Sequence, residues 1–151
     1  MPETRFETDI NRYMRTPTGY LMVLRQGDDL FEQLEILMER ESIPSASLTG
    51  FGFAGTVTFG FFDFDKKQYN PGTFENLELV SMTGTLGWKD GTPSIHAHGV
   101  AGNSTFSTVG GHMLALEVGT GSLEITITVH PNRLERAMDP SIGANILSLG
   151  C

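Results

Sequence analysis

Cysteine, long apolar runs and positive charge are the features that this 151-residue sequence has least of. Its single cysteine, Cys151, excludes a disulfide within the chain. No apolar run approaches the roughly 20 residues of a membrane-spanning helix. The polar start, Met1-Pro2-Glu3-Thr4-Arg5, lacks the apolar stretch of a secretory signal. These absences predict a cytoplasmic protein that does not enter a membrane.

Lysine and arginine, the side chains that bind nucleic acid phosphates, are scarce in this sequence. The chain has 10 of them against 18 acidic residues, which gives a net charge of -8, and none lies between Lys89 and Arg133. Non-specific binding to DNA needs clustered basic side chains that neutralise phosphates. Glycine-rich phosphate loops, Gly-x-Ser-x-Gly and Cys-x-x-Cys are also absent. The sequence therefore offers no basis for nucleotide, serine-hydrolase or dithiol chemistry.

Glycine is abundant, with 18 residues, and it separates short apolar and β-branched runs. This composition favours strands and tight turns. The length predicts one domain, which we place at residues 18–151, after a loosely structured N-terminal arm at residues 1–17.

One amphipathic helix is expected near the start of this domain. Asp28 or Asp29 is a good N-cap, and an apolar stripe runs from Leu30 to Met38 at helical spacing. Pro44 predicts that the helix ends near Ser42.

The rest of the chain is expected to be mostly strands. We predict them at residues 20–25, 45–64, 77–86, 94–100, 106–118 and 123–129. Turns are expected at Asn70-Pro71-Gly72 and Gly119-Thr120-Gly121, and the tail at 132–151 is expected to begin with a helical turn around 134–138. The fold class is therefore α+β, a mostly antiparallel sheet packed against one main helix.

Three of the four histidines lie close together in the sequence, in His96-Ala97-His98 and Gly110-Gly111-His112. Residues i and i+2 of a strand project from the same face, so His96 and His98 are expected side by side. Turn residues between 99 and 111 predict that the chain folds back and brings His112 beside this pair.

Three imidazoles on a rigid sheet suit zinc, and nickel, copper and iron remain alternatives. Three histidine ligands leave a fourth coordination position open, which is typical of reactive zinc sites. The alternative is that the His-x-His pair is simply a polar strand face. His130, before Pro131 at a strand end, is expected to be a surface histidine.

Glu78 is the one candidate for a catalytic carboxylate. It is a charge on an otherwise apolar strand, so it could orient a histidine or act on a substrate. The alternative is an ordinary surface or edge charge.

The order of several short motifs resembles the plants and prokaryotes conserved (PPC) domain, also called the domain of unknown function 296 family. The motifs span about residues 18–131 and are Arg25-Gln26-Gly27-Asp28-Asp29-Leu30, Ile43-Pro44-Ser45-Ala46, Leu77-Glu78-Leu79-Val80-Ser81-Met82-Thr83-Gly84, His96-Ala97-His98-Gly99 and Gly110-Gly111-His112-Met113.

This resemblance implies a sheet domain that assembles into a homotrimer. In prokaryotic members it also implies a metal, plausibly zinc, on the residues that match His96, His98 and His112. Plant members carry an Arg-Gly-Arg-Pro arm that reads A·T-rich DNA, and this chain has no such arm. It also has Glu75-Asn76-Leu77 where plant members have Gly-Arg-Phe before the glutamate that matches Glu78.

Three functions follow as hypotheses. The first is a trimeric, metal-carrying binding module with a regulatory or DNA-associated role. The second is a small zinc-dependent enzyme that uses metal-bound water in a hydrolase-like reaction. The third is direct DNA binding, which the acidic composition disfavours.

Overall fold

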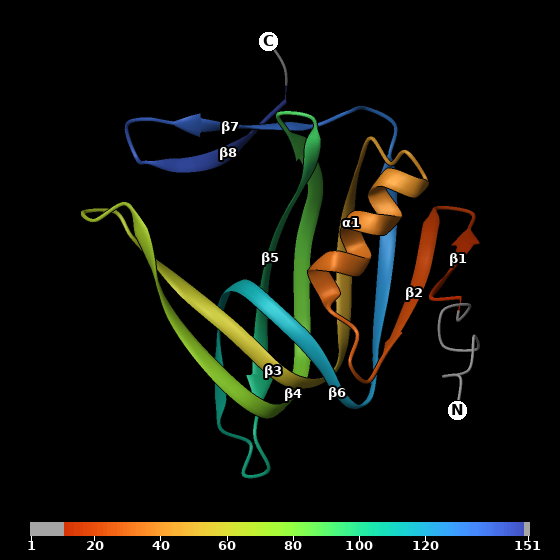
Figure 1. Cartoon of the computed structure of the whole chain (residues 1–151), viewed down its shortest axis with the longest axis vertical. Coiled ribbons are helices and arrows are strands. Elements are labelled where there is room, and N and C mark those ends of the chain that lie inside the picture. Colours follow the sequence, from red (N-terminus) through yellow and green to blue (C-terminus); the bar gives the residue numbers. More distant parts are fainter. Residues whose placement is uncertain (1–10, 150–151) are drawn as a thin grey trace, which may run out of the picture.

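Helix α1 lies against one side of a sheet of long, strongly bent strands in the computed structural model, which describes residues 11–149 (Figure 1). The elements are β1 (Tyr13–Thr16), β2 (Gly19–Arg25), α1 (Leu30–Arg40), β3 (Ser45–Asp63), β4 (Gln68–Lys89), β5 (Thr92–Gly102), β6 (Thr108–His130), β7 (Glu135–Asp139) and β8 (Ala144–Ser148). The α+β class and the mostly antiparallel sheet are as predicted. Among these described elements, no helix has the length and apolar character needed to span a bilayer.

The strands form one sheet in the order β1-β2-β6-β3-β4-β7-β8, and β5 pairs with both β4 and β6. Because β3 also pairs with both β4 and β6, the four longest strands close into a ring. Among residues 11–149, the only parallel pairing joins β4 to β7, at Trp88 and Glu135.

Helix α1 covers one side of this sheet and completes the core. The Asp29 carboxylate accepts a hydrogen bond from the Glu32 backbone N–H at 2.9 Å, which confirms the predicted N-cap. The helix ends before Ser42, as expected. The side chains that it buries against the sheet are Leu30, Leu34, Leu37 and Met38.

Two predicted turns are wrong because the strands continue through them. Residues 70–72 lie inside β4, where Asn70, Pro71 and Gly72 pair with β3. Residues 119–121 lie inside β6. At Gly119 a Cβ atom would lie 2.7 Å from the backbone nitrogen of Gly55, so this glycine allows two strand backbones to cross closely rather than forming a turn.

Both ends of the described chain also differ from expectation. Tyr13–Thr16, expected in a loosely structured arm, pairs with β2, and the rest of that arm up to residue 10 lies outside the described residues. The helical turn predicted around 134–138 is instead strand β7, which forms a hairpin with β8. Strand pairing satisfies every second backbone group of these short segments, and local propensity is too weak to outweigh it.

Candidate metal centre

His96, His98 and His112 converge because β5 pairs with its neighbours on both edges. On β4, Thr85 lies opposite His96 and Thr83 lies opposite His98. On β6, His112 lies directly opposite His98. The i, i+2 spacing places His96 on the same face, so the predicted return of the chain is what the structure shows.

Gly110 allows the two backbones to come this close. A Cβ atom at this position would lie 2.4 Å from the carbonyl oxygen of Gly99, a contact that no side chain tolerates. The double glycine before His112 therefore permits the β5–β6 pairing that sets the histidine register.

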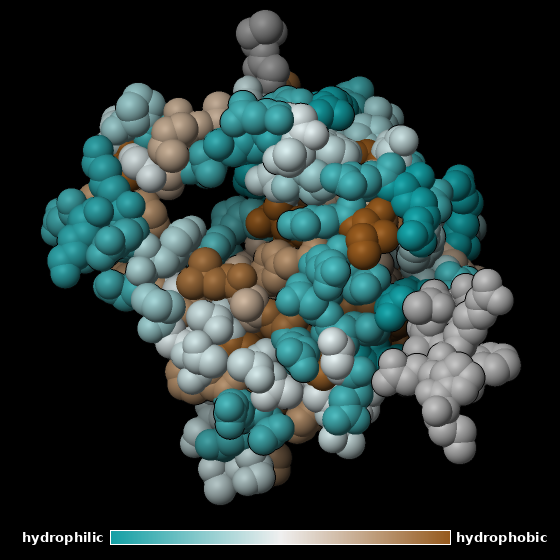
Figure 2. Space-filling model, viewed as in Figure 1, coloured by the Kyte–Doolittle hydropathy of each residue, from teal (hydrophilic) through white to brown (hydrophobic). Residues whose placement is uncertain are grey.

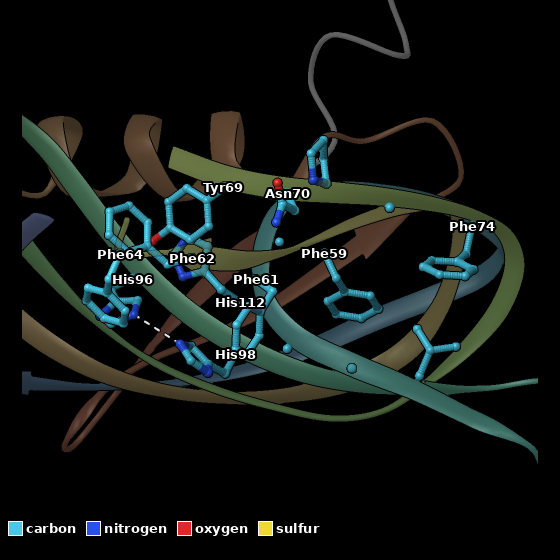
Figure 3. A pocket seen from close by; sticks show the side chains of 16 residues that line it. Phe59, Phe61, Phe62, Phe64, Tyr69, Asn70, Phe74, His96, His98 and His112 are labelled. Atoms are coloured by element: carbon cyan, nitrogen blue, oxygen red, sulfur yellow. Dashed lines mark hydrogen bonds between the residues drawn. The ribbon is translucent and has the colours of Figure 1, made fainter. Parts of the chain in front are cut away.

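The three rings form a tight cluster. The Nε2 atoms of His96 and His98 are 3.1 Å apart (Figure 3, dashed line). One ring nitrogen from each of the three histidines lies within 4.8 Å of the other two. Nitrogens around a tetrahedral zinc, each about 2.0–2.1 Å from the ion, lie about 3.4 Å apart. The His96–His98 pair is near this spacing, and the His112 nitrogen lies within 4.8 Å of both.

The surroundings favour neutral imidazoles, which are the form that ligates a metal. Burial, together with the neighbouring His96 and His98, lowers the pKa of His112 to about 4. Burial also lowers the pKa of His96, with further contributions from the charges of Arg136 and His98. The Nδ1 atom of His112 is buried and has no hydrogen-bond partner among the described residues. An uncompensated buried nitrogen beside two further imidazoles fits a metal ligand.

One side of the cluster opens into an aromatic cavity of about 890 Å³ (Figure 3). The Tyr69 ring stacks on the His112 ring, with centroids 4.4 Å apart and planes 11° from parallel. The other aromatic residues that line this cavity are Phe59, Phe61, Phe62, Phe64 and Phe74. No sequence motif predicted this cavity, although phenylalanine is dense between residues 59 and 64.

The other side opens into a smaller cavity of about 260 Å³, lined by His96, His112 and Arg136. Arg136 lies on β7 and is only 8% exposed. Burial lowers the pKa of its guanidinium. Arg136 was not among the predicted site residues, because a helical turn was expected there and nothing in the local sequence connects it to the histidines.

Glu78 is not brought to the histidines. It is exposed on β4, opposite Gly102 of β5 and Phe53 of β3. It lines neither of the two cavities, and no carboxylate of residues 11–149 lines them. His130 is also apart from the cluster, and its Nε2 atom lies 2.9 Å from the Ser47 hydroxyl.

The fold defines the class of protein: a mostly antiparallel sheet with one helix, which carries three clustered histidines on one face. Comparison with known proteins identifies the family. The model of the Plants and Prokaryotes Conserved (PCC) domain, the domain abbreviated PPC above, matches residues 11–131. The chain belongs to this family.

Several solved structures are similar over most of the chain. A protein of Ralstonia eutropha JMP134, provisionally named a DNA-binding protein, is 56% identical, with a TM-score of 0.90 over 93% of this chain and 97% of its own. A Bacteroides thetaiotaomicron protein with the same provisional name is 27% identical, with a TM-score of 0.82 over 91% and 98% of the two chains. A protein of Archaeoglobus fulgidus described as metal-containing is 27% identical, with a TM-score of 0.77 over 91% and 98%. No curated protein matches the chain.

The lowered pKa of His112 gives a test of the site in metal-free protein. The ring should stay neutral down to about pH 4 in the folded state, whereas an unfolded chain protonates it near pH 6.5. The unfolded state therefore binds more protons between these values. The stability from His112 is fully present above about pH 6.5 and is lost as the pH falls to about 4.

The measurement is an NMR titration of the ring protons in EDTA-treated protein, with urea unfolding at pH 7 and pH 4.5. His112→Gln should lose less stability between these two pH values than the native chain. An equal loss in both proteins, or a His112 ring that titrates near pH 6.5, would contradict the described environment.

Proposed function

We propose that this chain is a metal-binding module of the cytoplasm that assembles into a homotrimer and holds one divalent transition ion, zinc, on His96, His98 and His112. The observation that carries the proposal is the approach of three ring nitrogens to within 4.8 Å of one another. The neutral state favoured by burial and the unpartnered Nδ1 of His112 support it. The metal-containing relative of Archaeoglobus fulgidus supports it further.

The chain's own residues would hold the ion and control access to it. The strand pairing fixes the positions of the three rings, and the stacked Tyr69 limits rotation of His112. When bound, zinc with three histidine ligands acts as a Lewis acid on the donor atom that takes its open position. The two adjacent cavities leave room for such a donor.

A small zinc-dependent enzyme is the alternative function, supported by these same cavities. A hydrolase-like reaction needs a group that accepts a proton near the ion, commonly a carboxylate. Neither cavity is lined by a carboxylate of the described residues, and Glu78 does not fill that role. The residues present therefore favour ligand binding over hydrolysis.

Metal analysis of untagged protein tests the proposal. The native chain should retain about one zinc per chain, because all three nitrogens are needed to complete a stable site. His96→Ala and His112→Ala should each lose most of it. Removal of a residue that only orients a metal ligand commonly lowers metal affinity 10–100-fold, and removal of the ligand itself should lower it more.

His130→Ala is the matched control, since it removes a histidine of the same sheet that lies outside the cluster. It should retain the native zinc content. Stoichiometric zinc in both cluster variants would defeat the assignment, as would a native chain that takes up none.

Self-association would cover apolar surface that a single chain leaves exposed. Phe106 is 91% exposed and Phe61 is 79% exposed, and Val80 and Val100 face outward from β4 and β5. Exposed apolar side chains in this number are typical of interaction surfaces. The homotrimer predicts a mass in solution of about three times 16.5 kDa. Light scattering measures this mass, and a value that stays at a single chain in concentrated samples would contradict the trimer.

DNA is a second candidate partner, supported by the provisional names of the Ralstonia and Bacteroides relatives. The net charge of -8 and the absence of lysine and arginine between Lys89 and Arg133 oppose it. We expect no retarded band in a gel shift at 150 mM salt, with A·T-rich and mixed-sequence duplexes. A band that persists with both duplexes would restore direct DNA binding.

A further inference from the structure

Arg136 is a buried cation for which residues 11–149 supply no counter-charge. It is only 8% exposed. Its Nη2 atom donates a hydrogen bond to the Thr85 hydroxyl, and its Nε atom has no hydrogen-bond partner among the described residues. The ion pairs found within residues 11–149 do not include Arg136, so no carboxylate of that part of the chain lies within 4.0 Å of it. Burying an unpaired charge is costly, so the position of Arg136 points to a ligand that supplies the missing charge.

The guanidinium opens onto the same space as the histidines. Arg136, His96 and His112 line the cavity of about 260 Å³. Thr85, which accepts the Nη2 hydrogen bond, lies opposite His96 in the β4–β5 pairing. The cation and the metal-ligating face therefore belong to one continuous site.

This cavity lies between the β7–β8 hairpin and the hairpin that joins β3 to β4, where Phe62 and Tyr69 line it. Figure 2 shows a hollow below the β7–β8 hairpin. Ser94 and Asn145 add polar groups to its wall. Phe62 and Tyr69 line both this cavity and the aromatic one, so the two spaces meet at the histidines.

We propose that this cavity binds a small hydroxy- or oxo-carboxylic acid, whose carboxylate pairs with Arg136 while its second oxygen takes the open position of the ion. The inference rests on the proposed metal site. Arg136 lines the cavity, and the terminal N–H groups of its planar guanidinium match the two oxygens of one carboxylate. The volume suits an acid of a few carbon atoms, and its apolar substituent would extend into the aromatic cavity.

Lactate is the probe, and lactamide is its matched control, because lactamide keeps the size and the hydroxyl group but lacks the negative charge. Calorimetric titration of the zinc-loaded native protein should show lactate binding at least tenfold more tightly than lactamide. Arg136→Gln should retain zinc and lose at least tenfold in lactate affinity. Arg133→Gln, which removes an exposed arginine of the same segment, should bind lactate like the native chain.

The outcomes separate the two proposals. A native chain that binds no zinc contradicts the proposed function, and titration of the zinc-free protein then still tests the pairing of lactate with Arg136. Zinc binding without lactate binding overturns the inference alone. Equal affinities for lactate and lactamide, or undiminished lactate binding in Arg136→Gln, overturn it as well. If Arg136→Gln does not fold, the comparison of the two probes in the native chain decides.

Discussion

The pairing of β5 with a neighbour on each edge is the constraint on which the site depends. Strand β4 fixes the positions of His96 and His98, and β6 brings His112 opposite His98. A slip of one residue in either pairing would turn an imidazole to the other face of the sheet. The register in turn requires the close backbone approach at Gly110, where a side chain would collide with Gly99. The chemistry of three imidazoles is thus set by backbone geometry.

The site has two different walls, and their contrast explains what it can hold. The aromatic wall lines one side with apolar rings, and Tyr69 stacks on His112. The opposite wall carries the uncompensated guanidinium of Arg136. With the proposed divalent ion in place, the interior of this acidic protein would be locally positive. Such a field attracts small anions and disfavours cations, whatever the net charge of the surface.

The family and its solved relatives agree with the fold, but they leave the ligand open. The chain shares its architecture with relatives provisionally named for DNA binding and with one described as metal-containing. Architecture alone does not decide between these functions, because sites differ on a common fold. Among the described residues, the two cavities beside the histidines are lined by one basic side chain, Arg136, and by no carboxylate. This arrangement is a property of the site rather than of the fold.

Local signals in the sequence were enough for several features. Asp29 and the apolar stripe after it defined helix α1, because capping and helical spacing act over a few residues. The i, i+2 spacing of His96 and His98 and the glycines before His112 predicted the cluster, since it lies on two strands that follow one another. The helical turn expected at 134–138 failed because the pairing with β8 outweighs local propensity.

Only the tertiary structure decided what surrounds the histidines. Arg136 lies 24 positions after His112 in the sequence, and it reaches the cluster because β7 joins the sheet at Trp88 of β4. Glu78 lies on β4, which pairs with the histidine strand β5, yet it lines neither cavity. The sequence by itself determined the three clustered histidines, the helix and the strand-rich class, because these depend on short-range patterns. The walls of the site depend on strand pairings between distant segments, which no local pattern encodes.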